Sequence, residues 1–153
     1  MVGALDVTKL PKVASVADIL ERELKPTIKE WLRRVNLVPE LTCIPLSDAD
    51  RTAHLPKLYQ DLISRLRLAR DAESPISVTA AVHGQVRGLQ GYSASMLIHE
   101  SRLLQVSTFN TLNLHHSELD PNRVLSDVVV IADEVDAQLM EAVSSLAQST
   151  GQN

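Results

Sequence analysis

The sequence predicts an all-α fold: a single-domain helical bundle of about five helices, with a globin-like arrangement as one form of it and a long C-terminal helix. Apolar residues recur at spacings of three and four along most of the chain, whereas the period-two alternation typical of strands is almost absent. At 153 residues a chain buries roughly two-thirds of its extended surface, enough for a core without disulfides or metal ions. We expect one domain over residues 1–153, with a core over about 14–147.

The first helix is expected over residues 14–35, where one apolar stripe continues through Trp31. Pro26 predicts a kink in it, because proline removes a backbone donor and clashes with the preceding turn. Residues 36–46 contain two prolines and no periodicity, which is typical of a loop. Within this loop, Cys43 is expected to be a small buried apolar residue.

The second helix begins at a capping box over residues 47–50 and runs to about Ala69, with a bend or restart at Pro56. Leucines at steps of three and four form its apolar stripe. Its basic residues are expected to form a solvated outer face without a function. They are Arg51, Arg65, Arg67 and Arg70.

Three helices are expected in the second half of the chain. Ser74-Pro75 opens the third, since proline is tolerated where a backbone N–H would be unpaired, and Gly91 ends it. The fourth spans about 93–114, and the fifth runs from about 121 to 147 with an apolar seam that suits either a bundle core or a dimer contact. The seam consists of Leu125, Val128, Ala132, Val135, Leu139, Ala142 and Leu146.

The composition limits the classes of partner. Fifteen Lys and Arg against nineteen Asp and Glu give a formal charge of −4, the wrong sign for neutralising many phosphates, so no nucleic acid partner is expected. The single cysteine excludes an internal disulfide and favours a reducing compartment. The first residues lack the unbroken apolar stretch of a signal peptide, and no later run approaches 18 apolar residues. These features predict a cytoplasmic protein without a membrane partner.

Residues 83–92 form the most informative stretch. His83, Arg87 and Gln90 lie at positions 0, +4 and +7, so their polar ends share one face of the predicted helix. Beside them runs a stripe of small residues, which consists of Ala80, Gly84, Gly88 and Gly91. A glycine inside a helix costs about 1 kcal/mol relative to alanine, which indicates a compensating close approach of a neighbouring backbone.

Two interpretations of this stretch stay open. In the first, the helix packs tightly on the helix over 93–114, Arg87 pairs with a carboxylate such as Glu100, and His83 bonds to a backbone group. In the second, the same polar row lines a pocket or a signalling surface, where His83 can act as a proton switch.

This region resembles the central motif of the RsbRD-type N-terminal sensor domain, which occurs in RsbT co-antagonists of bacterial stress signalling and at the front of some sensor histidine kinases. The matching residues are His83, Gly84, Arg87, Gln90, Gly91, Tyr92, Glu100, Arg102, Leu103 and Leu104. Earlier residues agree as well, and the resemblance spans about 14–146. These are Trp31-Leu32, Asp50-Arg51 and His54-Leu55-Pro56.

The resemblance implies a non-enzymatic sensory or regulatory domain without a cofactor, which relays a conformational signal through its last helix. Family members often continue into a STAS or histidine-kinase region, whereas this chain stops a few residues beyond Leu146. We expect either a stand-alone version or a fragment, with a downstream signalling protein or output module as partner. The ligand-binding or regulatory residues would be His83, Gly84, Arg87, Gln90, Gly91, Tyr92, Glu100 and Arg102. A homodimer and relay contact would use Leu125, Val128, Ala132, Val135 and Leu139.

Three alternatives stand beside this expectation. Histidine phosphotransfer would use His83 as phosphoacceptor, although the following cation and glycine each lie one position later than such domains place them. No metal site is expected, because His99-Glu100 begins like a zincin motif without its second histidine, and the adjacent rings of His115-His116 point about 100° apart. A haem- or bilin-binding globin-like sensor rests on fold analogy.

Overall fold

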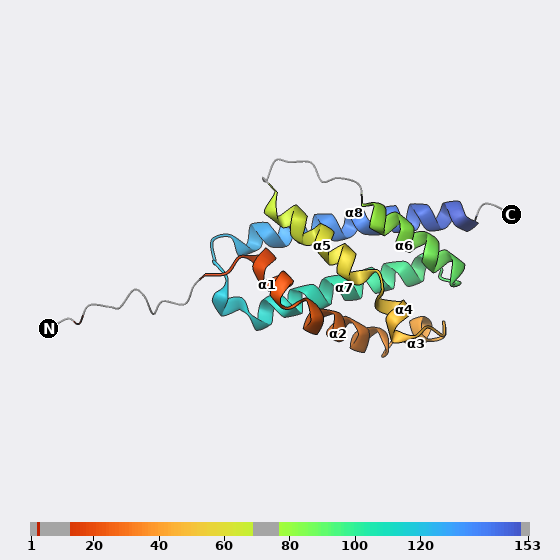
Figure 1. Cartoon of the computed structure of the whole chain (residues 1–153), viewed down its shortest axis with the longest axis horizontal. Coiled ribbons are helices and arrows are strands. Elements are labelled where there is room, and N and C mark those ends of the chain that lie inside the picture. The colour runs from red at the N-terminus through yellow and green to blue at the C-terminus, as the bar shows by residue number, and fades with distance from the viewer. Residues whose placement is uncertain (1–2, 4–12, 69–76, 151–153) are drawn as a thin grey trace.

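The long last helix is the element on which much of the fold packs. The computed structural model describes residues 3, 13–68 and 77–150. Its helices are α1 (Val16–Arg22), α2 (Leu24–Val35), α3 (Pro39–Thr42), α4 (Asp48–Thr52), α5 (Leu55–Arg67), α6 (Val78–Leu89), α7 (Ala94–Leu114), the 3-10 helix η2 (His116–Glu118) and α8 (Val124–Thr150). Helices α5, α6 and α7 pack on α8, and α7 also contacts α2 (Figure 1). The predicted all-α fold with a long C-terminal helix is confirmed.

Prolines divide the first two predicted helices. The segment 14–35 forms α1 and α2, which are separated at Glu23, because Pro26 in the first turn of α2 lacks the donor that would continue the α1 ladder. Pro56 lies in the first turn of α5 and separates it from α4 in the same way. The described residues therefore contain more helical segments than the five expected, and α3 forms within the predicted loop.

Serine N-caps begin α1, α4, α6 and α7. The hydroxyls of Ser15, Ser47, Ser77 and Ser93 each accept a hydrogen bond from the backbone N–H three residues further on. The predicted caps at residues 47 and 93 are thus confirmed. Helix α6 begins at Val78 after its Ser77 cap, whereas the predicted start at Ser74-Pro75 lies outside the described residues, as does Arg70.

Two predictions about single side chains are wrong. Arg51, expected on a solvated face, is buried, because it donates to the carbonyls of Leu41 and Ile44 at the C-terminal end of α3. Cys43, expected to be buried, is exposed, and its thiol donates to the carbonyl of Glu40. Both errors follow from the missed helix α3, whose last carbonyls need donors and whose end lies at the surface.

Helix α8 does not use its predicted seam uniformly. Val135, Ala142 and Leu146 are buried in the core, while Leu125 is 76% exposed. Val128, Ala132 and Leu139 are half-buried. Acidic residues recur along α8.

No helix in the described part of the chain is both long and apolar enough to cross a bilayer.

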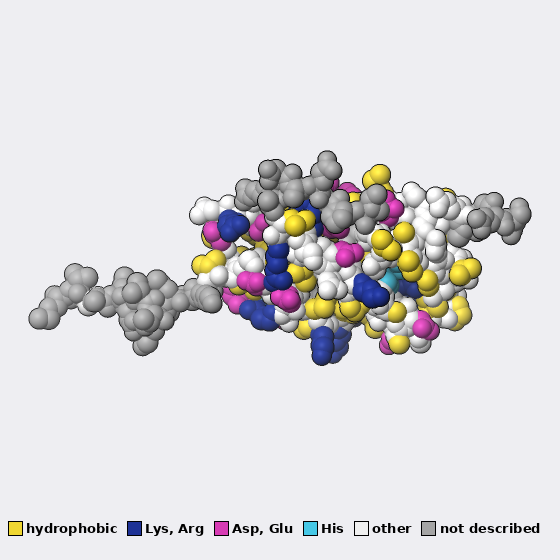
Figure 2. Space-filling view, turned by 45° about the horizontal axis from the view of Figure 1, so that its top comes forward, with side chains coloured by type: hydrophobic (Ala, Val, Ile, Leu, Met, Phe, Trp, Pro, Cys, Tyr) yellow, Lys and Arg dark blue, Asp and Glu magenta, His cyan; other side chains and the backbone are white. Residues whose placement is uncertain are grey.

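Helix α6 carries an exposed apolar stripe on the side away from the core. Val78, Val82, Val86 and Leu89 follow one another at steps of four, four and three, which places them on one face. In Figure 2, hydrophobic side chains gather over the end of the molecule where α6 lies, next to basic side chains and a visible histidine. This face has no covering element among the described residues.

Candidate functional site

A buried ion pair joins α6 to α7. Arg87 Nε donates to Glu100 Oε2 at 3.2 Å, and Arg87 is only 1% exposed, so the predicted pairing of these residues is confirmed. Gly91 ends α6 as predicted, with a φ of 92° that suits glycine. The turn then returns the chain, since the Tyr92 N–H donates to the Arg87 carbonyl at 2.9 Å in a Schellman arrangement.

This ion pair belongs to a closed set of bonds, the polar network (Arg51, Arg87, Tyr92 and Glu100). Arg51 Nη1 donates to Tyr92 Oη at 2.9 Å, and Tyr92 Oη donates to Glu100 Oε1 at 2.7 Å. Arg87 Nη2 donates to the Arg51 carbonyl at 2.7 Å, which closes the circuit, and Arg87 Nη1 donates to Gln90. Charge-assisted bonds of this kind are the strong ones, so the network fixes α4, α6 and α7 relative to one another. Two guanidinium groups against one carboxylate leave it with excess positive charge.

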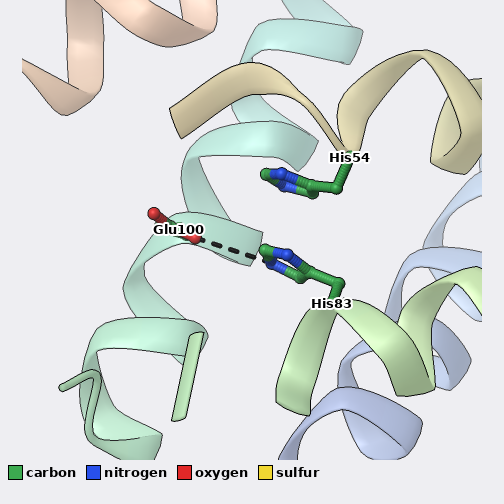
Figure 3. Close-up of side chains that lie close together, drawn as sticks. All are labelled: His54, His83 and Glu100. Atoms are coloured by element: carbon green, nitrogen blue, oxygen red, sulfur yellow. Dashed lines mark ion pairs between the residues drawn. The ribbon is translucent and has the colours of Figure 1, made fainter. Parts of the chain in front are cut away.

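Beside the polar network lies the histidine pair (His54 and His83), shown in Figure 3. The two imidazole rings stack with centroids 3.5 Å apart and an interplanar angle of 10°. His54 stands at the start of α5, where Trp31 packs edge-on against it with centroids 5.9 Å apart. His83 Nε2 lies 3.8 Å from Glu100 Oε2, beyond hydrogen-bonding distance. Neither imidazole hydrogen-bonds to a described residue. The predicted hydrogen bond between His83 and a backbone group is therefore wrong, and His83 stacks on the ring of His54 instead.

Burial and positive charge keep both imidazoles neutral. Burial, with the charge of Arg87, lowers the pKa of His83 to about 3. Burial, together with His83 and Arg87, lowers the pKa of His54 well below its ordinary value. Burial also raises the pKa of Glu100, while Arg87 and Tyr92 oppose that rise. The pair therefore offers uncharged N–H donors and nitrogen lone pairs at neutral pH.

The neutral histidine pair predicts a loss of stability in acid. An unfolded histidine takes up a proton near pH 6.5, whereas folded His83 does so only near pH 3, so the unfolded state binds more protons between these values. This contribution to the free energy of unfolding is full above about pH 7 and should fall by up to about 1.4 kcal/mol per pH unit for each histidine as the pH drops. Urea unfolding at a series of pH values measures the slope.

Two variants isolate the contribution of His83. His83→Gln should flatten the acid slope by about one proton, because glutamine does not titrate. His116→Gln, at an exposed position beyond the end of α7, should leave the slope unchanged. An equally steep slope in wild type and His83→Gln would contradict the prediction.

The histidine pair and Glu100 together provide three groups that could ligate a metal ion. Ligand atoms of His54, His83 and Glu100 lie within 4.8 Å of one another. A zinc ion needs nitrogen lone pairs that converge at about 2.0–2.1 Å, whereas nearly parallel rings direct their lone pairs side by side. Glu100 is already bonded by Arg87 and Tyr92, and the excess positive charge repels a cation. In this arrangement the imidazoles are better placed as hydrogen-bond donors than as metal ligands.

Gly84, the residue after His83, packs directly on the backbone of α8. A Cβ at Gly84 would clash with the backbone of Ala142, whose carbonyl carbon would lie 2.8 Å away, so this approach requires glycine. The predicted close packing is confirmed, but its predicted partner, the helix over 93–114, is wrong. Adjacent residues point about 100° apart on a helix, so His83 faces α7 while Gly84 faces α8.

The structure unites most of the predicted site residues. His83, Arg87, Gln90, Tyr92 and Glu100 meet around the ion pair, while Gly84 and Gly91 shape the backbone. Arg102 is exposed on α7. Sequence reasoning missed Arg51 and His54 as site residues, although both lie within the segments that carry the RsbRD-type resemblance.

The geometry weighs against histidine phosphotransfer, one of the alternative functions. A phosphoacceptor histidine must be reached by a partner's active site, whereas His83 is 9% exposed and has one ring face covered by His54. The chain matches no family model, no curated protein and no solved structure.

Proposed function

We propose that this chain is a sensory or regulatory domain without catalytic activity, of the kind used in bacterial stress or two-component signalling. The observation that carries the proposal is the contact between Gly84 and Ala142, one residue away from His83. A change at the histidine pair acts on α6, and α6 meets α8 through backbone atoms, which cannot adjust as a flexible side chain does. A movement of α6 at the histidine pair would therefore be passed on to α8 through this contact.

Close packing makes this contact a suitable relay. Protein interiors transmit strain because they contain few voids, and packed elements shift between discrete arrangements rather than deforming continuously. Displacement of His83 would move Gly84, and α8 would shift or rotate in response. An output partner of the STAS or kinase type would then read the position of α8.

A homodimer forms part of the proposal. Leu125, Val129 and Met140 are exposed on α8 and lie within about 60° of one another around its axis, as helical geometry places residues separated by 4 and 11 positions. A second copy of the chain would cover this apolar face. Val135, expected in the dimer contact, is instead committed to the core of its own chain.

Hydrogen exchange on the full chain tests the relay. His83→Ala should raise the exchange rates of α8 amides around Ala142 by about tenfold or more, because the support of α6 at the site is lost. Amides of α1, which is distant from this contact in the bundle, should keep their rates (Figure 1).

Val82→Ala is the matched control for His83→Ala. Val82 precedes His83 on α6 and is exposed, so its truncation should leave α8 unchanged. The proposal fails if α8 exchange is the same in His83→Ala and wild type, or if Val82→Ala changes it equally.

A further inference from the structure

The histidine pair opens onto a groove between the start of α5 and the exposed face of α6. This groove has a volume of about 330 Å³, within the range of small-molecule sites. Its polar lining includes His54, His83 and Arg87, and its α6 wall includes Val78, Val82 and Val86. We call it the valine groove.

The histidine side of the valine groove suits an acidic group. His83 is nine-tenths buried, lines the groove, and makes no hydrogen bond to a described residue, so its ring nitrogens are available to a ligand. Each neutral imidazole of the pair can donate one N–H. Lys57 and Asp50 in the groove lining balance each other in charge. The polar network beside the histidine pair has two guanidinium groups against the single carboxylate of Glu100, so an anion is favoured over a cation.

The α6 wall suits a hydrocarbon chain. Val78 and Val86 are separated by eight residues, or about 12 Å along the helix axis, with Val82 between them. All three valines are exposed. A ligand that covers them removes their apolar surface from water, which favours binding. An occupant that matches both the histidines and the valines has an acidic head group and an apolar chain.

We propose that the valine groove binds an apolar monocarboxylate of the medium-chain fatty acid class, with the carboxylate at the histidine pair and the hydrocarbon along the valines of α6. This inference rests on the proposed function, for which it names the signal. Carboxylate oxygens accept the imidazole N–H bonds that the protein itself leaves unmade. The bound head group would then press on His83, next to the Gly84 contact with α8.

Binding can be followed with the chain's single tryptophan. Trp31 packs on His54, so its emission should change when the histidine pair is engaged, and calorimetry on the full chain gives the affinity independently. Decanoate, used below its micelle-forming concentration, should bind. Decanol shares the tail and acetate shares the head, so each should bind at least about tenfold more weakly.

Two surface variants locate the ligand without disturbing the core. Val82→Glu places a negative charge on the α6 wall and should weaken decanoate binding at least about tenfold. Ile98→Glu is the matched control, because Ile98 on α7 and Val82 are both 51% exposed, and it should leave the affinity unchanged.

Three outcomes would overturn the inference. Absence of decanoate binding would do so, and equal affinity for decanol would show that the charge is irrelevant. Stoichiometric binding of zinc chloride that is lost in His54→Gln would assign the cluster to a metal instead. None of these results affects the relay, which is measured by hydrogen exchange in His83→Ala without ligand, so the two proposals fail separately.

Discussion

Replacing Gly84 by leucine is expected to destabilise the fold by more than about 3 kcal/mol, because overpacking against a rigid neighbour is not relieved by rotamer changes. The side chain would enter the backbone of Ala142, which can yield only if α6 and α8 separate. Separation would expose apolar surface along the whole interface. Urea unfolding monitored by circular dichroism measures the loss.

A matched pair of alanine variants separates the clash from helix propensity. Alanine is favoured over glycine inside a helix by about 1 kcal/mol, so Gly84→Ala would stabilise α6 if space were available. We expect it to destabilise instead. Gln85→Ala, at the exposed neighbouring position, should change stability by less than about 0.5 kcal/mol. A Gly84→Ala protein as stable as wild type would refute the close contact.

Arg87→Ala is expected to lower the free energy of unfolding by about 3–5 kcal/mol. The substitution leaves the carboxylate of Glu100 buried without its ion-pair partner, and such uncompensated charges are strongly destabilising. It also removes the donor to the Arg51 carbonyl, so α4 loses a bond to α6. Thermal and urea unfolding of the purified variant measure the effect.

Arg33→Ala serves as the control for Arg87→Ala. Arg33 pairs with Glu30 on the exposed side of α2, where an ion pair contributes between 0 and about 1 kcal/mol. A loss of this small size in Arg87→Ala as well would show that the polar network does not hold the helices together.

The fold was largely predictable because its signals are local. Residues three and four apart share a helix face, a serine caps the N–H three positions ahead, and Pro26 or Pro56 interrupts its own turn. These interactions need no knowledge of distant segments. Helix α3 escaped prediction because four residues are too few to show a periodicity.

The site was predicted only in part because its remaining members converge from separate elements. Arg87 and Glu100 lie close enough in sequence for their pairing to be inferred. His54 meets His83 only after α5 packs beside α6, and no spacing rule connects them. Glycine content signalled a close approach at Gly84, but not which helix approaches, since that depends on how α6 is rotated in the bundle.

The closed polar network also constrains how this sequence can diverge. Each member of the network is hydrogen-bonded to other members, as Tyr92 is to Arg51 and Glu100. A substitution at one position leaves a buried polar group without its partner, which lowers the free energy of unfolding by about 1–3 kcal/mol, or more for a charged group. We therefore expect the four positions to change together during evolution, because a single replacement is destabilising until a second one compensates for it. This is strong epistasis among the four positions. Exposed neighbours such as Gln85 are free to vary one at a time.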